Sequence, residues 1–318
     1  PGRSRSGGGR KRPRAGVRHP VSSSPDRYDV VCVGGAMTGS SVAYWLSENP
    51  DFVGRVLVVE PDWTYEAAQT TRAQNSIREQ FTNSVNMQLS RFGMEFIEHF
   101  HDNVQVNGES PELNFHGTGY LFLADDEAHY EQLVAESLEQ VANGADVTML
   151  RPVQMAERFP YMDVSQIAGG RVGGMREGSF DGWAFFQGLR QRAIHNDVTY
   201  IKDRVVDINV ADGRAHSVVL ESGRTVEAGW VVNTAGCRAR LIAAMVGLDL
   251  PVEPRARTSF VFDCRRPIDH IVPLTITPIG VHFRREQNHY MCGAVPVDDD
   301  VVGYEDLEIR HDEWEDQI

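Results

Sequence analysis

The sequence predicts a mixed α/β (α+β overall) protein in which a parallel sheet is combined with a separate antiparallel sheet. Three features of the 318-residue chain predict this class. Residues 28–60 follow the order strand, glycine turn, helix and strand, which is a βαβ unit with parallel strands. Residues 230–236 form a further buried strand that runs into a turn of small residues. Beyond Pro254 the strands alternate between apolar and polar residues, which is typical of an antiparallel sheet.

The N-terminal residues 1–25 are expected to be a disordered basic tail. They are rich in Gly, Arg, Ser and Pro, so ordering them would bury too little apolar surface to offset the entropy lost. A mitochondrial transit peptide shares this composition, but Gly7–Gly9 and Pro13 oppose the amphipathic helix that it needs. An origin in cloning or upstream translation fits equally well. Residues 1–24 carry seven Lys or Arg and no acid, so the net charge of −14 becomes −21 for the rest of the chain.

Composition excludes several classes of protein. The acidic body repels phosphate backbones, so no nucleic-acid partner is expected. No segment approaches the run of about 18 apolar residues that a membrane span requires. Cysteines are far apart and form no CxxC pair, so their spacing predicts neither a metal site nor a disulfide framework. The cysteine usage fits a reducing compartment best.

The elements follow from apolar periodicity and from turn residues. The first βαβ unit has a buried strand at 28–33, a helix at 38–46 that ends before Asn49-Pro50, and a buried strand at 55–60. Three further helices are predicted at 84–101, from about 125 to 143, and at 182–195. The remaining strands are predicted at 118–123, 198–210, 215–221, 224–233, 259–263, 280–284 and 290–294. The segment 182–233 is interpreted as a second βαβ-like unit.

The last residues are expected to lie inside a helix. Tyr304, Leu307, His311, Trp314 and Ile318 recur at intervals of three or four residues, and no Gly or Pro stop signal follows them. From this pattern we expect the chain to be cut within the fold, so that a C-terminal part is missing.

The turn after the first strand carries a dinucleotide-binding pattern. Residues 34–39 read Gly-Gly-Ala-Met-Thr-Gly, where the fingerprint GxGxxG belongs. Gly34 permits the tight turn, and Gly39 allows the helix to pack closely on the strand. Ala36 replaces the middle glycine, which a turn with negative φ tolerates. The pattern predicts that a pyrophosphate lies at the helix N-terminus. The contacts would come from Gly34, Gly35, Ala36, Met37 and Gly39.

An acid closes the second strand. Glu60 follows Gly34 by 26 residues, where a carboxylate accepts hydrogen bonds from both hydroxyls of an adenosine ribose. The alternative is an ordinary surface glutamate at a strand end. An acid here disfavours a ribose 2′-phosphate and so argues against NADP. Pro61, the next residue, is placed in the same contact.

Several segments, in this order, resemble the D-amino-acid oxidase superfamily of FAD-dependent oxidoreductases. The resemblance extends over about residues 27–318. Beyond Tyr28–Glu60, it is carried by Gln69-Thr70-Thr71, by Ser76–Phe81, by Glu177–Asp181, by Val231–Gly236 and by Pro251–Arg255. Through Ser76–Phe81 and His282–Glu286, it is closest to a branch that contains a mitochondrial protein assisting assembly of respiratory complex I and its bacterial relatives. This resemblance implies a protein of the bacterial cytoplasm or the mitochondrial matrix that is not secreted.

The resemblance implies a Rossmann-like FAD-binding domain that is built from separate segments, and a substrate domain with an antiparallel sheet. Residues 26–105 and 178–250 would form the FAD-binding domain. Residues 106–177 and 251–318 would form the substrate domain, without its C-terminal part.

The resemblance also implies site residues. Thr70, Thr71 and Ser76 would lie near the pyrophosphate and the flavin, although hydroxyl residues are common in any loop. Val205 would meet the adenine through its backbone, and Thr234, Ala235 and Gly236 would approach the FAD; sheet packing and a turn would explain the same residues. The cations proposed for catalysis are Arg78, which could stabilise reduced flavin or orient a carboxylate, and Arg284. Strand alternation would aim either Arg284 or Arg285 at the flavin, and a solvent-facing arginine is the alternative for each.

The activity implied is oxidation of an amine or an amino acid by hydride transfer to flavin N5, which needs no side-chain nucleophile. Electrons would pass to oxygen or to another electron-transfer acceptor. No His lies between His19 and His99, and no Cys lies between Cys32 and Cys237, so we expect FAD to be bound without a covalent link. Two alternatives remain: a non-catalytic FAD-binding assembly factor for a respiratory complex, and an NAD-dependent dehydrogenase. The separate Thr234–Gly236 segment favours FAD over NAD.

Overall fold

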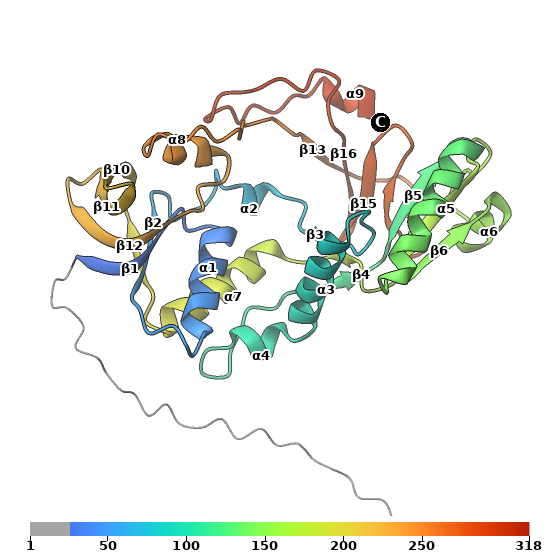
Figure 1. The fold of residues 1–318 in the computed structure, drawn as a ribbon. Helices are drawn as coiled ribbons and strands as arrows, with labels where there is room; N and C mark the ends of the chain where they lie inside the picture. The colour runs from blue at the N-terminus through green and yellow to red at the C-terminus, as the bar shows by residue number, and fades with distance from the viewer. Residues whose placement is uncertain (1–25, 318) are drawn as a thin grey trace, which may run out of the picture.

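The computed structural model describes residues 26–317, so the expectations for residues 1–25 and Ile318 lie outside the described residues. Most strands belong to a six-stranded or a seven-stranded sheet. The helices are α1 (Met37–Glu48), α2 (Gln69–Arg72), α3 (Ser84–Glu98), α4 (Phe100–Val104), α5 (Glu127–Ala142), α6 (Pro152–Arg158), α7 (Gly182–His195), α8 (Ala239–Ala244) and α9 (Glu313–Gln317), with a 3-10 turn η1 (Gly236–Arg238). The two sheets lie at opposite ends of the molecule, with α1, α3, α4 and α7 between them (Figure 1).

The six-stranded sheet combines parallel and antiparallel pairs. Its order is β10-β11-β12-β1-β2-β9, with β12, β1, β2 and β9 parallel to one another. The strands β10, β11 and β12 form an antiparallel meander at one side. Their bounds are β1 (Arg27–Val33), β2 (Val56–Glu60), β9 (Thr199–Lys202), β10 (Val205–Ala211), β11 (Arg214–Leu220) and β12 (Thr225–Asn233).

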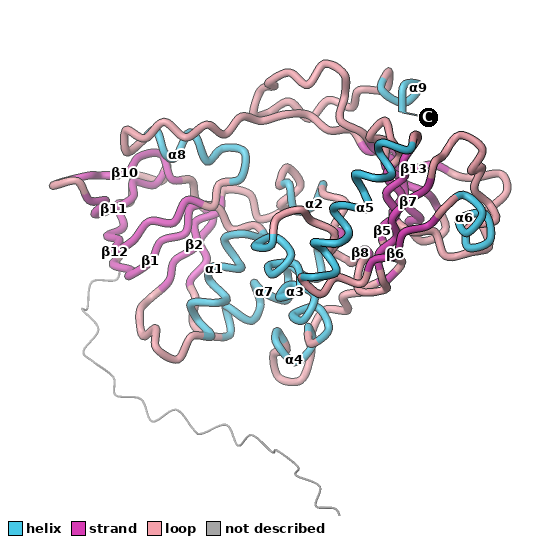
Figure 2. The backbone as a smooth tube through the Cα atoms, turned by 45° about the vertical axis from the view of Figure 1, so that its right-hand side comes forward, coloured by secondary structure: helices cyan, strands magenta, loops and turns pink. Residues whose placement is uncertain are grey.

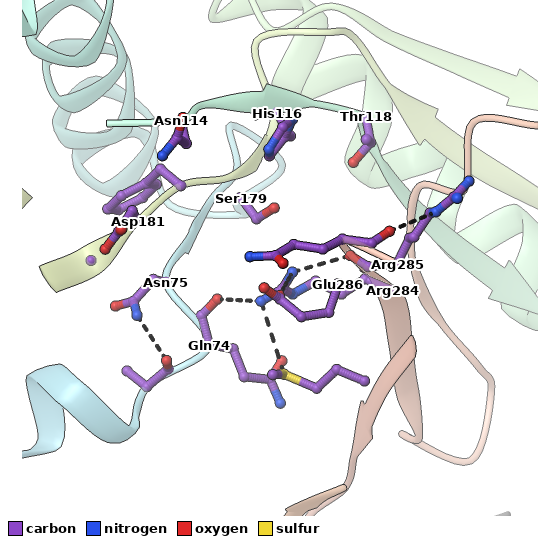
Figure 3. Close-up of a pocket in the computed structure, with 15 residues that line it drawn as sticks. Gln74, Asn75, Asn114, His116, Thr118, Ser179, Asp181, Arg284, Arg285 and Glu286 are labelled. Carbon is purple, nitrogen blue, oxygen red and sulfur yellow. Dashed lines mark hydrogen bonds and ion pairs between the residues drawn. The ribbon is translucent and has the colours of Figure 1, made fainter. Parts of the chain in front are cut away.

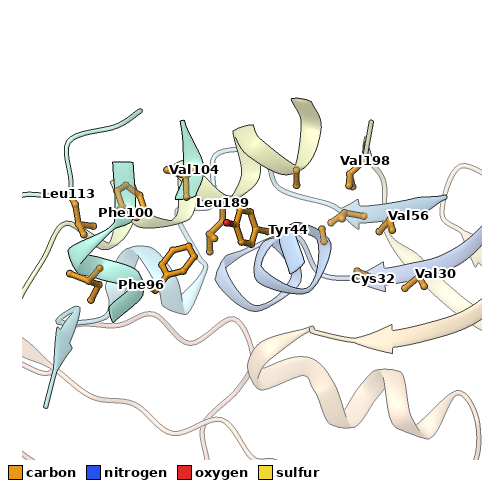
Figure 4. Close-up of a cluster of buried hydrophobic side chains, with 14 of the residues drawn as sticks. Val30, Cys32, Tyr44, Val56, Phe96, Phe100, Val104, Leu113, Leu189 and Val198 are labelled. Carbon is orange, nitrogen blue, oxygen red and sulfur yellow. The ribbon is translucent and has the colours of Figure 1, made fainter. Parts of the chain in front are cut away.

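Helices α1 and α7 cover one face of this sheet. Every residue of β2 is buried, as expected of a parallel strand that is covered on both faces. Val30 and Val56 pack with Tyr44 of α1 and Leu189 of α7, and the cluster continues to Phe96 in α3 (Figure 4). On the opposite face, Val31 and Leu57 share a second apolar cluster with Val205 and Val218 of the meander and with Ile242 of α8. The carboxyl ends of β1 and β2 are therefore held between two apolar layers.

The seven-stranded sheet has the order β13-β16-β15-β14-β5-β7-β6 and lies at the other end of the molecule (Figure 2). All its neighbouring strands are antiparallel except β14 and β5, which are parallel. The bounds are β5 (Tyr120–Ala124), β6 (Val147–Leu150), β7 (Gly169–Gly173), β13 (Ser259–Phe262), β14 (Leu274–Ile276), β15 (His282–Glu286) and β16 (His289–Gly293).

A third, small sheet has the order β3-β8-β4. It is formed by β3 (Ser76–Ile77), β8 (Gly178–Ser179) and β4 (His116–Gly117), which come from distant parts of the chain. The fold class predicted from the sequence, with parallel and antiparallel sheets, is confirmed. Within residues 26–317, no helix is long and apolar enough to cross a membrane.

Four predicted elements differ from the structure. The helix expected at 84–101 is interrupted at His99, which has non-helical φ and ψ and separates α3 from α4. The strand expected at 198–210 is two strands, β9 and β10, which lie at opposite edges of the sheet. The second βαβ-like unit is therefore α7 and β9 followed by an antiparallel meander. The strand expected at 280–284 begins later, because Gly280 occupies a turn with φ +85°.

The helix expected from Tyr304 onwards is wrong over most of its length. Only α9, at Glu313–Gln317, is helical. The Asp306 carboxylate accepts the Glu308 N–H and pairs with Arg310, and such local side-chain bonds compete with helix formation. Trp314 packs instead against Phe260 and Phe262 of β13, so the apolar spacing reflects tertiary contacts.

Candidate functional site

The glycine turn at 34–39 closes tightly around the start of α1. Gly34 has φ +103°, a conformation that side chains rarely adopt, and a Cβ on Gly39 would collide with the Gly34 carbonyl oxygen. Ala36 precedes α1 with φ −70°, so the methyl group there is compatible with the turn. Ala36 provides no side-chain cap, and the first turn of α1 has no acidic residue. The N-terminus of this helix therefore favours an anion.

Glu60 is fixed against that turn. Its Oε2 accepts the Gly35 N–H at 2.8 Å, and its Oε1 accepts the Asp62 N–H at 2.9 Å. The residue is 9% exposed. A Cβ on Gly35 would lie 2.9 Å from the Glu60 Cβ, so the glycine allows this close approach. Each carboxylate oxygen keeps a second acceptor site, which suits a pair of ribose hydroxyls.

The segment after β12 braces the other side of the turn. The Thr234 hydroxyl donates to the carbonyl oxygens of Val33 and Gly34, at 3.0 and 2.8 Å. The Ala235 N–H donates to Asn233 Oδ1 at 3.3 Å. Gly236 has φ +58° and begins η1. These residues lie beside the glycine turn although some 200 residues separate them in sequence.

Helix α2 reaches the turn from a third direction. The Thr70 hydroxyl accepts the Met37 N–H at 3.2 Å, and so contacts the first residue of α1. The Thr71 hydroxyl donates to the Tyr65 and Ala68 carbonyl oxygens, which shapes the loop that leads into α2.

Val205 and Pro61 flank the Glu60 end of the sheet. Val205 is buried at the start of β10, two residues after Asp203, whose N–H donates to the Glu60 carbonyl oxygen at 3.2 Å. Pro61 follows Glu60 directly and is half-buried. Three features fit the adenosine and pyrophosphate of a dinucleotide: the bare backbone at Gly34 and Gly35, the helix N-terminus and the buried acid. The individual contacts stay predictions.

A pocket of about 730 Å³ lies between the α2–β3 loop, the start of α7 and strand β15 (Figure 3). Its polar lining includes Gln74, Asn75, His116, Ser179, Asp181 and Arg284. Asp181 caps α7 by accepting the Ala184 N–H at 2.9 Å. One short segment of the chain links the glycine turn to the pocket. Thr70 contacts the turn, and Gln74 in the same segment lines the pocket.

Arg284 is the buried member of the predicted arginine pair. It is 7% exposed and lines the pocket, whereas Arg285 is exposed at the pocket rim. Arg284 Nη1 donates to the Arg285 carbonyl oxygen and pairs with Glu286. Its Nη2 donates to the Gln74 carbonyl oxygen at 3.0 Å and contacts Met291 Sδ. Among the described residues, its buried Nε has no partner. The protein therefore holds this guanidinium in place at the pocket wall, with Glu286 as its charge partner.

Arg78 lies outside the pocket lining and against aromatic rings. Its guanidinium carbon is 4.6 Å from the Phe81 ring centroid, 5.4 Å from Phe122 and 5.9 Å from Tyr120. In residues 26–317 no hydrogen bond or ion pair engages it, so its N–H donors are available to an anion. The Tyr120 hydroxyl donates to Ser76 Oγ at 2.6 Å, which places Ser76 close to Arg78.

Glu177 organises the segment that carries Ser76 and Arg78. Its Oε1 accepts the N–H groups of Glu79 and Gln80, at 2.6 and 3.1 Å. Its Oε2 accepts Gln80 Nε2 at 2.7 Å and the Tyr120 N–H at 3.1 Å. The side chain is almost completely buried. Burial raises the pKa of Glu177, while these four donors act in the opposite direction.

Sequence reasoning missed most of the pocket. Gln74, His116, Ser179 and Glu286 come from four separate segments, and no local spacing relates them. The sequence signals that fell on the pocket lining were the Arg284–Arg285 pair and the Glu177–Asp181 motif, which contains Ser179. The small β3-β8-β4 sheet brings the Glu177–Asp181 and Ser76–Phe81 motifs together, and its pairing is non-local.

Comparison with known proteins identifies one family, both by its family model and by the named relatives. Residues 29–317 match the family described as DAO, FAD dependent oxidoreductase. A bovine protein named FAD-dependent oxidoreductase domain-containing protein 1 is 33% identical, over 92% of this chain and 67% of its own length. The chain spans about two thirds of the length of such vertebrate relatives.

Solved structures share the fold. L-proline dehydrogenase from P. horikoshii has a TM-score of 0.79 and 20% identity, covering 92% of this chain and 75% of its own. L-α-glycerophosphate oxidase from Mycoplasma pneumoniae, dithionite-reduced with FAD bound, has a TM-score of 0.73 and 17% identity. It covers 90% of this chain and 75% of its own.

Proposed function

The chain belongs to the DAO family of FAD-dependent oxidoreductases, and we propose that it binds FAD and oxidises an amine or an amino acid at the carbon next to nitrogen. When bound, FAD supplies the acceptor for the hydride that leaves this carbon. The observation that carries the proposal is that the segment 69–75 connects the glycine turn to the pocket. Thr70 contacts the glycine turn at one end of this segment, and Gln74 and Asn75 line the pocket at the other.

The chain's own residues have distinct tasks in this proposal. Gly34, Gly35, Ala36, Met37 and Gly39 form the pyrophosphate turn, which Thr70 and Thr234 brace. Glu60 accepts from the ribose hydroxyls, beside Pro61 and Val205. Thr71, Ser76, Ala235 and Gly236 complete the surroundings of the cofactor. Arg78 stabilises negative charge on the reduced cofactor or orients a carboxylate.

The charges at the pocket support an amino acid over a simple amine. Arg284 and Arg285 bring two cations to the pocket, and only Arg284 pairs with a carboxylate among the described residues. The lining also contains the carboxylates of Asp181 and Glu286, so the pocket carries charges of both signs, as a zwitterionic amino acid would require. Electrons then pass to oxygen or to another acceptor.

We expect FAD to be released intact when the protein is precipitated with acid. In the described residues the cofactor-facing segments 34–39, 60–61, 69–76 and 234–236 contain no His, Cys or Tyr that could attach to a flavin. The measurement is the flavin content of the supernatant and of the washed pellet, identified by mass. Colour that stays in the pellet would contradict non-covalent binding.

Turnover with candidate substrates tests the proposed activity. The protein is incubated with N-methyl amino acids and with L- and D-amino acids, and the carbonyl product of imine hydrolysis is measured with oxygen or an artificial acceptor. We expect product from at least one amino acid and little from the matching amine without a carboxylate. A protein that retains FAD but yields no product with any member would support a non-catalytic FAD-binding role instead.

A further inference from the structure

Gln74 occupies a notch in the seven-stranded sheet. Ser259 of β13, Gly293 of β16 and His282 of β15 lie side by side across three neighbouring strands. The middle position is a glycine, and a Cβ there would lie 2.9 Å from His282 Nε2 and 3.1 Å from Gln74 Nε2. The missing side chain thus leaves the room that the Gln74 amide fills.

The Gln74 amide nitrogen bridges β13 and β15, the strands on either side of β16. Nε2 is 3.0 Å from Ser259 Oγ and 2.6 Å from His282 Nε2. In this orientation the amide nitrogen is the donor to both partners, and we infer that His282 is a neutral imidazole with its proton on Nδ1. Burial and the charge of Arg284 lower the pKa of His282, which favours the same neutral form.

The same residue also fixes the pocket wall. The Gln74 carbonyl oxygen accepts from Arg284 Nη2 at 3.0 Å, two residues along β15 from His282 (Figure 3). Side chain and main chain of Gln74 therefore hold β15 at two points against the loop that continues from α2. Both Gln74 and Arg284 line the pocket.

We propose that Gln74 is a positioning residue, which sets the place of Arg284 and of the β15 wall and thereby the affinity of the pocket for a carboxylate ligand. This inference rests on the proposed function for the identity of the ligand. The contacts of Gln74 with Ser259, His282 and Arg284, which we call the Gln74 clamp, involve described residues only and can be measured without turnover.

The first experiment observes the clamp directly. Nitrogen chemical shifts of ¹⁵N-labelled histidine, assigned with His282→Gln, report which ring nitrogen carries the proton. We expect the Nδ1–H form of His282 in the unaltered protein. In Gln74→Ala we expect a mixture of tautomers, because the donor to Nε2 is gone. An Nε2–H imidazole in the unaltered protein would overturn the proposal.

The second experiment measures affinity with benzoate as the probe, by calorimetry. Gln74→Ala removes hydrogen bonds to two partners, so we expect benzoate to bind about ten-fold more weakly. Gly293→Ala, which fills the notch and leaves Gln74 in place, should weaken binding in the same direction. The two changes act on one contact, so the double variant should lose less than the sum of the two effects.

Controls separate positioning from general damage. Gln132→Ala removes a comparable glutamine hydrogen bond on the exposed face of α5 and should leave benzoate affinity unchanged. Thermal midpoints and bound FAD should stay close to the unaltered values in Gln74→Ala. Unchanged benzoate affinity in Gln74→Ala, or a loss matched by Gln132→Ala, would overturn the positioning role. If the His282 tautomer and the benzoate affinities are as expected but no substrate is turned over, the proposed function is overturned and the positioning role of Gln74 stands.

Discussion

Replacing Glu177 with Gln is expected to lower the free energy of unfolding by about 3–5 kcal/mol. The carboxylate accepts four N–H groups, two on each oxygen. A glutamine offers one oxygen, so its NH₂ group would face two of these donors. A Cβ at Gly173 would collide with Glu177 Oε2, which shows how little room the side chain has to turn away.

Urea unfolding followed by circular dichroism measures this loss. Glu139→Gln is the matched control, because this exposed carboxylate on α5 has no hydrogen-bond partner among the described residues and should change stability by less than about 0.5 kcal/mol. Equal unfolding midpoints for the two variants would contradict the role given to Glu177. Partial unfolding of Glu177→Gln without urea would agree with it.

Replacing Glu60 with Gln is expected to weaken FAD binding by about 1.5–3 kcal/mol, or roughly 10- to 150-fold in Kd. The charge that we propose accepts from the ribose is lost, and an NH₂ group would face the N–H of Gly35 or Asp62. The turn that receives the pyrophosphate would be disturbed together with the ribose contact.

Quenching of flavin fluorescence on titration of the apoprotein gives the Kd. Glu66→Gln serves as the control, because Glu66 lies in the following loop and its carboxylate is exposed. Its affinity should equal that of the unaltered protein. An unchanged Kd in Glu60→Gln would mean that Glu60 supports the backbone only.

The nucleotide end of the site is predictable from sequence because its signals are local. The turn at 34–39 and the acid at Glu60 belong to one βαβ unit, in which hydrophobic strands and glycines determine the geometry within some 30 residues. The structure shows the tight turn, the negative φ at Ala36 and the buried acid in contact with Gly35. Whether these residues contact FAD is a matter for the experiments above.

The pocket end could not be predicted in the same way. Its walls meet through β3-β8-β4 pairing and through Gln74, whose partners are 185 and 208 residues away. Strand alternation separated Arg284 from Arg285 but could not show that Arg284 is held by Gln74 and Glu286. Apolar periodicity likewise could not show whether the spacing of residues such as Trp314 reflects a helix or, as in the structure, packing on β13.

Anaerobic titration of the purified protein with amino acids shows whether an amino acid reduces the bound flavin. Visible absorbance reports the oxidised flavin, and no electron acceptor is present to restore it. We expect at least one N-methyl, L- or D-amino acid to bleach the bound flavin, and the colour to return when an acceptor is admitted. If dithionite bleaches the bound FAD but no member of the panel reduces it, the protein does not oxidise these amino acids and the proposed activity is wrong.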